Sequence, residues 1–360
     1  MRKSNIFNLV MSLMIFSCSA SYIDEIIPID AGPDMEDPEI NINFPTSGTQ
    51  IRVPEDETPI NIDFEVRDDI EIQSIRILLN QTEIASFTDF LDYRRVILVH
   101  RHENLGNGPH ILTIEAVDIA GKLSSETVNF EKVEPYTPVY ENEVFYLPFD
   151  GDVMELISTQ NASIQGSPTF VNGISGRAYQ GTANAYLTFP TAGLLHEEFS
   201  AVFWYKVNAS PNRAGILTIS PPDTNNPENM NNRTSGFRLF REAAGSMQRI
   251  KLNVGNGSAD NWFDGGAAAD INPAAGEWVH VAITLTQTTA AVYINGLPVS
   301  QGTFPGVDWT GTNLLSIGSG APRFTEWGHL SDASAIDELR LFSKALSAQE
   351  ILGIMQTERP

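Results

Sequence analysis

Short stretches in which apolar residues occupy every second position dominate this sequence, and they recur from Pro38 almost to the C-terminus. Residues 60–66, Ile-Asn-Ile-Asp-Phe-Glu-Val, show the alternation clearly, and it returns in residues 75–79 and 111–117. Successive side chains of a β-strand point to opposite faces of its sheet, so this period is typical of strands with one buried face. Gly, Pro, Asn and Asp separate the stretches at short intervals. The chain is therefore expected to be all-β and to fold as sandwiches of antiparallel sheets.

Helical signal is confined to the C-terminal end of the chain. Ser347 precedes residues 348–352 and supplies the hydroxyl that caps a helix N-terminus. From Glu143 to about Gln356 the strand pattern continues without a convincing internal repeat. Strands without helices over such a length predict a jelly roll of two large antiparallel sheets.

The first 17 residues have the composition of a signal segment. Arg2 and Lys3 open the chain, residues 6–16 are mostly apolar, and the small residue Ser17 precedes Cys18. A positive start, a short apolar run and a small residue before the cut site are the parts of a secretory signal. The apolar run is shorter than the roughly 20 residues that a membrane-spanning helix needs. We therefore expect residues 1–17 to be a signal peptide that is removed.

Cys18 is the only cysteine, so it has no partner for an internal disulfide. Residues 15–18, Ile-Phe-Ser-Cys, resemble a bacterial lipobox, in which diacylglycerol is attached to the cysteine. Two or three acyl chains such as palmitate anchor a protein stably, whereas one does not. The resemblance implies a lipoprotein of the bacterial cell envelope, lipidated at Cys18 and held on the surface or periplasmic face of the outer membrane. The alternative is a spare thiol after an ordinary signal peptide.

Residues 18–37 contain Pro, Asp and Glu with little periodicity and predict an extended acidic tether. The chain as a whole has 45 acidic and 22 basic residues, a net charge of −23. Such a surface repels the phosphates of nucleic acids and of anionic lipid headgroups. Nucleic acid is therefore excluded as a partner, strongly acidic polysaccharides are disfavoured, and contact with the membrane is expected through the lipid anchor alone.

Residues 38–134 resemble a bacterial immunoglobulin-like module. The resemblance rests on Asp-Asp-Ile-Glu-Ile at residues 68–72 and on residues 108–121, where a Gly-x-His turn, a strand and an Asp-x-Ala-Gly turn follow one another. Modules of this family usually act as spacers, which is what the resemblance implies here. Residues 130–140, with two prolines, link the module to the rest of the chain.

Residues 139–358 resemble the laminin-G-like, or concanavalin-A-like, jelly roll. Seven short segments carry the resemblance through their order and spacing: 146–151, 173–179, 199–206, 277–284, 292–296, 315–318 and 336–347. Asn295-Gly296 lies between alternating apolar residues, which is typical of a tight β-hairpin. Residues 199–207 carry bulky groups on both strand faces and predict a central strand.

Carboxylate pairs decide whether this fold hydrolyses glycosidic bonds. Hydrolases of the family carry a Glu-x-Asp-x-x-Glu pattern, which residues 143–360 lack. Asp63-Phe64-Glu65 imitates part of it, but the alternation predicts that these two carboxylates lie on a solvated strand face. A Gly-x-Ser-x-Gly turn for a nucleophilic serine is absent from the sequence as well. We therefore expect no enzymatic activity.

Two sets of side chains could bind metal. The family resemblance favours a structural calcium ion held by Asp150, Asp152 and Asp337, from the first and last strands of the jelly roll. The alternative is that Asp337 caps a turn or pairs with Arg340 or Arg177. His100, His102 and His110 are instead expected to be surface histidines, because nothing else in the sequence completes a metal site.

Aromatic side chains are the platforms on which sugar rings stack. Trp204 and Trp278 lie in strand motifs and are expected in or near the core. Trp262, Trp309 and Trp327 lie in stretches rich in Gly, Asn, Asp and Pro, which predict loops. Each of these three either covers the core or contacts a ligand.

Arg238 and Arg241 lie close to two phenylalanines in a strand-like stretch and are further candidates for contact with a glycan from a concave sheet. The alternative is that they are ordinary exposed polar residues of a strand.

Taken together, the chain resembles accessory glycan-binding lipoproteins of polysaccharide-uptake systems. This implies a non-catalytic protein that binds a polysaccharide or oligosaccharide beside an outer-membrane transport partner. Two alternatives stay open: an adhesion or structural protein of the cell envelope that binds a protein partner, and a glycoside hydrolase or lyase with unrecognised catalytic residues.

Overall fold

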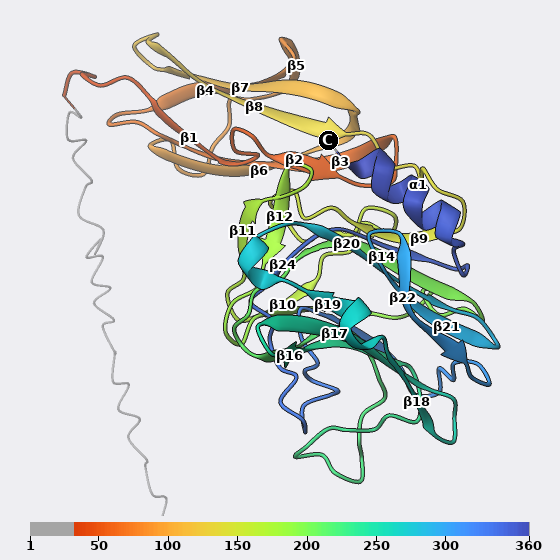
Figure 1. Ribbon diagram of the computed structural model, residues 1–360. Coiled ribbons are helices and arrows are strands. Elements are labelled where there is room, and N and C mark those ends of the chain that lie inside the picture. The colour runs from red at the N-terminus through yellow and green to blue at the C-terminus, as the bar shows by residue number, and fades with distance from the viewer. Residues whose placement is uncertain (1–31, 360) are drawn as a thin grey trace, which may run out of the picture. The chain divides into compact units, whose positions relative to one another are not determined.

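The computed structural model describes residues 32–359. The predicted signal peptide, Cys18 and most of the predicted tether lie outside the described residues, so these assignments stay predictions. The chain divides into two compact units, in which strands predominate (Figure 1). Among the described residues no helix is long and apolar enough to cross a membrane.

The N-terminal strands form two sheets, of order β1-β3-β6 and β2-β8-β7-β4-β5. Their bounds are β1 Glu39–Phe44, β2 Gln50–Arg52, β3 Glu57–Arg67, β4 Ile72–Leu79, β5 Thr82–Phe87, β6 Arg95–Gly106, β7 Gly108–Asp118 and β8 Leu123–Val133. Alternate residues of β3, β4 and β7 are buried between the sheets, as the period of two predicts. The assignment of this unit to the immunoglobulin-like family stays a prediction.

Two polar predictions for the N-terminal strands have different outcomes. Glu65 points away from the core and pairs with Arg67 and Arg95, as expected for a solvated strand face. The surface position expected for His110 is wrong. Its ring is buried, stacks on Phe130 at 5.3 Å between centroids, and bonds the carbonyl of Gly106 through Nε2.

The C-terminal strands form two larger sheets. Sheet A has the order β10-β13-β23-β15-β16-β17-β18, with β19 paired to β17, and sheet B has the order β11-β12-β24-β14-β20-β21-β22, with β9 paired to β24. The bounds in sheet A are β10 Ser163–Gln165, β13 Tyr186–Pro190, β15 Arg213–Ile219, β16 Phe237–Ala244, β17 Met247–Gly255, β18 Asp260–Asp264, β19 Asp270–Ile271 and β23 Leu314–Ile317. Those in sheet B are β9 Glu143–Leu147, β11 Thr169–Asn172, β12 Arg177–Gln180, β14 Phe199–Lys206, β20 Val279–Leu285, β21 Thr289–Ile294, β22 Leu297–Thr303 and β24 Ala335–Phe342.

The main core lies between sheets A and B, and a smaller one lies on the outer face of sheet B. Strand β14 sits between β24 and β20 and serves both: Phe203 points into the main core, whereas Val202 packs against helix α1, Ala348–Glu358. This confirms the prediction of a central strand with bulky groups on both faces.

Local signals near the C-terminus behave as expected. Ser347 caps α1 and forms a reciprocal capping box with Glu350. Asn295 and Gly296 both have positive φ and join β21 to β22, as a tight hairpin requires. Two short 3₁₀ helices, Gly266–Ala269 and Pro273–Ala275, had no counterpart in the sequence-based expectations.

Candidate functional site

Trp262 lies on the outer face of sheet A, not in a loop as the sequence suggested. It belongs to the edge strand β18 and pairs with Asn253 of β17, which in turn pairs with Arg238 of β16. The residues next to them, such as Phe263 and Leu252, point into the main core. Because side chains alternate along a strand, Trp262, Asn253 and Arg238 share the opposite face. Trp262 is 45% exposed and is the outermost member of this row.

A second tryptophan completes an aromatic platform. Trp327 comes from loop 318–334, which joins β23 to β24, and its ring stacks on Trp262 with 5.6 Å between centroids and an interplanar angle of 18°. Phe324 and His329 of the same loop pack on Phe240 of β16, with centroid distances of 5.7 Å and 4.4 Å. These contacts fix the loop to sheet A, so the platform is held in place by packed rings.

An arginine packs against one side of the platform. The guanidinium carbon of Arg233, from loop 220–236, lies 4.5 Å from the centroid of Trp327. Its Nη1 donates a hydrogen bond to Asp260 Oδ2 at 2.9 Å, and Asn253 Nδ2 donates to the same oxygen at 2.8 Å. A cation over an aromatic face is attracted by the ring quadrupole, and Asp260 balances its charge. The platform is therefore flanked by a neutralised ion pair.

A polar groove of about 570 Å³ continues from this ion pair. Amide and hydroxyl side chains predominate in its wall, which is formed by Asp223, Asn225, Asn226, Asn231, Asn232, Arg233, Thr234, Ser258, Ala259 and Asp260. Such side chains donate and accept hydrogen bonds without a net charge. The groove is suited to a ligand that offers many hydroxyl groups, and Trp262 and Trp327 adjoin it through Arg233.

On the other side of the platform, one lysine forms ion pairs with two carboxylates. Lys251 Nζ lies 3.0 Å from Glu242 Oε2 and 3.1 Å from Asp264 Oδ2, and His329 Nε2 donates to Glu242 Oε1 at 3.0 Å. Burial favours the neutral acids, but the hydrogen bonds and charges around them outweigh it and lower the pKa of both Glu242 and Asp264. A general acid of a glycosidase needs a raised pKa. This pair is therefore unsuited to glycosidic cleavage.

Arg238 is fully buried, so the expectation of an exposed or ligand-contacting side chain is wrong. Its Nη2 donates to the carbonyls of Asn232 and Ser235, each at 2.6 Å. Burial is the main cause that lowers its pKa to about 9, and the nearby charge of Arg233 adds to the shift. Arg238 thus holds loop 220–236 against sheet A and supports the groove from beneath.

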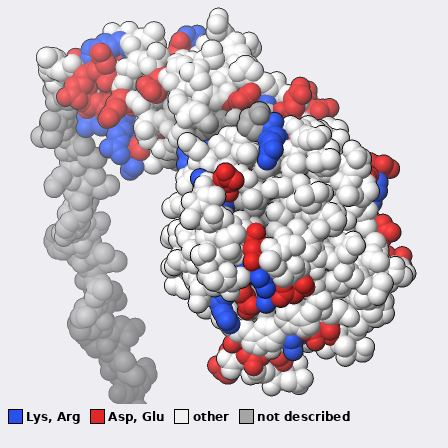
Figure 2. Space-filling model, in the orientation of Figure 1, with Lys and Arg blue, Asp and Glu red and all other residues white. Residues whose placement is uncertain are grey.

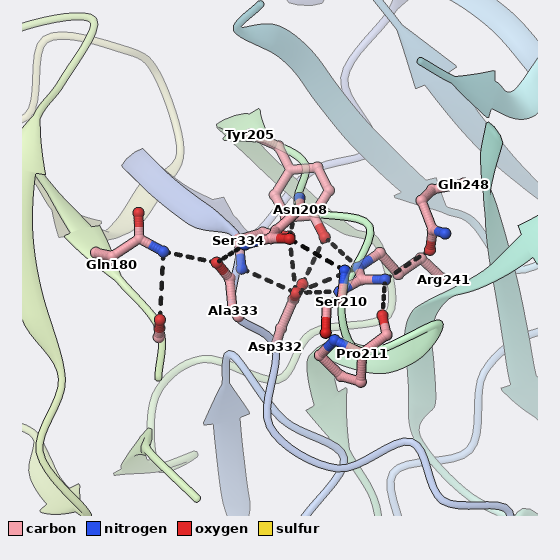
Figure 3. A network of polar contacts seen from close by, with 11 residues as sticks. Gln180, Tyr205, Asn208, Ser210, Pro211, Arg241, Gln248, Asp332, Ala333 and Ser334 are labelled. Atoms are coloured by element: carbon pink, nitrogen blue, oxygen red, sulfur yellow. Dashed lines mark hydrogen bonds and ion pairs between the residues drawn. The ribbon is translucent and has the colours of Figure 1, made fainter. Parts of the chain in front are cut away.

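Arg241 is buried as well, which corrects the same expectation. It alternates with Phe240 and points between the sheets, where Nη2 donates to Asp332 Oδ1 at 2.7 Å and Nη1 donates to Gln248 Oε1 at 2.6 Å. Tyr205 donates its hydroxyl hydrogen to the other oxygen of Asp332 at 2.5 Å (Figure 3). This network of buried polar side chains closes one end of the main core.

The comparisons with known proteins agree with this architecture. Residues 180–352 match the protein-family model Laminin_G_3, described as the concanavalin A-like lectin/glucanases superfamily. These residues form a concanavalin A-like domain. With the two sheets around one core, the match confirms the prediction of a laminin-G-like jelly roll. No curated protein matches the sequence.

Several solved structures are similar to part of this chain. Domain 4 of the arabinanase AbnA from Geobacillus stearothermophilus, in complex with arabinotriose, is 18% identical, with a TM-score of 0.45 over 59% of this chain and 98% of that chain. The binding domain of Paraclostridial Mosquitocidal Protein 1 is 14% identical, with a TM-score of 0.44 and coverage of 60% and 52%. The binding domain of botulinum neurotoxin serotype C1 is 14% identical, with a TM-score of 0.43 and coverage of 61% and 52%. The chain therefore spans about half the length of these toxin domains.

Trp309 is partly buried and packs against the core of the concanavalin A-like domain. It follows β22 in a loop, as predicted, but its ring packs on Phe199 and Phe237 at 5.6 Å and 6.3 Å between centroids. Its Nε1 donates to the carbonyl of His196 at 2.8 Å. Of the two roles that the sequence left open, Trp309 has the role of a lid over the core.

The three predicted calcium ligands do not form a shared site. Asp337 Oδ2 accepts hydrogen bonds from the backbone N–H groups of Ile174 and Ser175, and Asp150 Oδ1 accepts one from Arg177. Asp152 instead accepts from the N–H of Met154. Among the described residues, the oxygens of these three aspartates do not converge at the spacing of a metal site, and a calcium ion bound by them stays a prediction. The alternative that Asp337 caps a turn describes the structure.

Arg233, Asp260 and the amide-rich loop 220–236 were not among the residues singled out from the sequence. A signal for the loop was present, because residues 225–232 contain five asparagines. No local pattern brings this loop to Trp262 and Trp327, since the three segments meet through tertiary contacts such as those of Arg233 with Trp327 and with Asp260.

Proposed function

We propose that the concanavalin A-like domain binds a neutral glycan without cleaving it. The observation that carries the proposal is the stacked pair of Trp262 and Trp327 beside an amide-rich groove. The apolar face of a sugar ring packs on an exposed indole, and its hydroxyls pair with amide groups. The groove offers Asp223 and Asp260 against Arg233, so it has no excess of positive charge for an acidic sugar.

Surface charge supports the neutral class of ligand. On the visible face of the C-terminal unit, basic side chains are scattered among acidic ones and form no continuous patch (Figure 2). Acidic polysaccharides and nucleic acids need such a patch, because they carry regularly spaced negative charges. The absence of cleavage is supported by the lowered pKa values of Glu242 and Asp264, which Lys251 holds ionised.

A second hollow of the domain is less suited to sugars. It measures about 510 Å³ and is lined by Gln180, Lys206, Asn208 and mostly backbone and small side chains. It contains no aromatic ring for stacking. We therefore assign the glycan to the Trp262 platform.

Substitution of the platform tests the proposal. Trp262→Ala and Trp327→Ala are each expected to weaken binding of a neutral polysaccharide by roughly tenfold to a hundredfold, because aromatic anchors dominate such contacts. An array of polysaccharides identifies the ligand, and affinity electrophoresis measures the loss.

Leu297→Ala is the matched control, because Leu297 is an exposed apolar residue of sheet B, far along the chain from the platform strand. It should bind as the wild type does. Normal binding by both tryptophan variants, with unchanged thermal unfolding, would refute the platform. New reducing ends in the wild-type incubation would show instead that the domain is an enzyme.

We further propose that Cys18 anchors this binding domain in the bacterial cell envelope, where it captures glycan for an outer-membrane transport partner. The support is the signal-like segment, the lipobox-like residues 15–18 and the single cysteine. Cys18→Ala is expected to abolish incorporation of a palmitate analogue in growing cells, because no other thiol is present. Cys18→Ser provides a closer isostere as a second variant. Undiminished label in both would rule out the anchor.

A further inference from the structure

Three aspartates that are distant in the sequence converge in the N-terminal unit. Asp34 precedes β1, Asp68 follows β3, and Asp118 is the last residue of β7. Each offers one carboxylate oxygen, and these oxygens all lie within 4.8 Å of one another. Among the described residues, this is the only group of three or more acidic, histidine or cysteine side chains with such spacing.

The burial of Asp118 is a second observation that points to a cation. This side chain is fully buried, and its Oδ1 accepts a hydrogen bond from the N–H of Lys122 at 2.8 Å. None of the described residues donates a hydrogen bond to its Oδ2, and the same holds for the buried Oδ2 atoms of Asp34 and Asp68. A buried carboxylate oxygen without a donor is costly, so it normally pairs with a charge or binds a metal.

Lys122 supplies only part of the balancing charge. Its Nζ lies 2.5 Å from Asp34 Oδ1 and 2.7 Å from the carbonyl of Glu36, but 3.6 Å from Asp118 Oδ2, beyond hydrogen-bond distance. One ammonium against three carboxylates leaves two negative charges. A divalent cation would neutralise them.

We propose that Asp34, Asp68 and Asp118 bind a calcium ion. All three ligands offer hard oxygen atoms, and calcium accepts six to eight such ligands in irregular geometry, with water completing the shell. Magnesium is less suited, because it requires a near-ideal octahedron of shorter bonds. The ion would tie the segment before β1 to the end of β7, and so fix where the chain from the predicted lipid anchor enters the folded unit.

Isothermal titration of the chelator-treated full chain with calcium chloride tests the site. One ion per chain is expected, and calcium at 100 times its dissociation constant should raise the temperature of the first unfolding transition by roughly 5 °C or more. Asp118→Asn and Asp68→Asn should each weaken binding at least tenfold. Asp34→Asn should do the same, and it covers the case in which the buried variants fail to fold, because Asp34 lies outside the strands.

Asp150→Asn is the matched control, because Asp150 belongs to the rival set of calcium ligands predicted from the sequence. It should bind calcium as the wild type does. Absence of calcium binding by the wild type, wild-type affinity in a folded Asp34→Asn variant, or loss of binding in Asp150→Asn would each overturn the proposal. The outcome is independent of the glycan site, which lies in the other unit.

Discussion

Replacing Asp332 by alanine is expected to lower the free energy of unfolding of the concanavalin A-like domain by about 3 to 5 kcal/mol. Arg241 and Asp332 are both fully buried, and the distance between Nη2 and Oδ1 is 2.7 Å. Removal of the carboxylate would leave the guanidinium charge in the core and would free the hydroxyl of Tyr205. A buried charge without its partner costs far more than the intact pair contributes.

Urea unfolding of the variant measures this loss. Asp264→Ala is the control, because Asp264 also pairs with a basic residue of the same domain, Lys251, but is partly exposed. Its loss should cost no more than about 1 kcal/mol, as is usual for surface ion pairs. If Asp332→Ala and Asp264→Ala lose the same small amount, water must reach Arg241, and the network does not close the core as described.

This network also shows where sequence reasoning ends. Arg241 and Asp332 are 91 positions apart, and a strand pattern cannot tell an arginine that points into the core from one that lies on the surface. The alternation does predict that Phe240 and Arg241 face opposite sides. It gives no reason why the charged one of the two should point inward, because its partner comes from a distant loop.

The roles of the candidate tryptophans also depend on tertiary contacts. Trp309 and Trp327 both lie in stretches rich in turn residues, and nothing local separates them. Trp309 packs between Phe199 and Phe237, whereas Trp327 stacks on Trp262. Trp262 itself lies on a five-residue edge strand, too short for a clear period of two. The candidate residues could be named from the sequence, but their separation into core and platform depends on tertiary contacts.

Strand faces, the hairpin at Asn295-Gly296 and the cap of α1 could be predicted because each depends on neighbours in the sequence. The calcium site predicted at Asp150 and Asp337 depends instead on contacts between segments that are distant in the sequence. Both carboxylates do come close to one segment, residues 173–177, but they bind its backbone N–H groups. The sequence motifs correctly predicted that both aspartates lie near the same segment. They did not show whether the carboxylate oxygens accept hydrogen bonds from N–H groups or bind a cation.

Three carboxylates surround one arginine beneath the C-terminal helix, which leads to a dependence of stability on pH. Arg340 Nη1 lies 2.5 Å from Glu143 Oε1, its Nη2 lies 3.0 Å from Glu338 Oε2, and its Nε lies 2.7 Å from Glu358 Oε1. Glu358, the last residue of α1, also accepts a hydrogen bond from Trp204 Nε1 at 2.9 Å. Burial, the largest cause, and the nearby charge of Glu338 raise the pKa of Glu358 to about 7, although Arg340 opposes the shift.

We expect the domain to lose stability as the pH rises between about 4.5 and 7. The pKa of Glu358 is higher in the folded protein than its ordinary value of 4.5, so the folded protein binds this proton more tightly than the unfolded chain. The stabilisation is complete below the unfolded pKa and is lost as the pH approaches the folded one. The shift corresponds to about 3 kcal/mol at 1.36 kcal/mol per pKa unit. Glu358→Gln keeps the shape and stays neutral, so it should match the wild type at about pH 5 and exceed its stability at about pH 8. Urea unfolding at both pH values measures the difference.

Glu350→Gln is the control in the same helix, because hydrogen bonds from Lys344 and Ser347 lower the pKa of Glu350 to about 2 and place its titration below this range. It should leave the wild-type slope unchanged. A Glu358→Gln variant with that same slope would show instead that Glu358 is already ionised throughout the range.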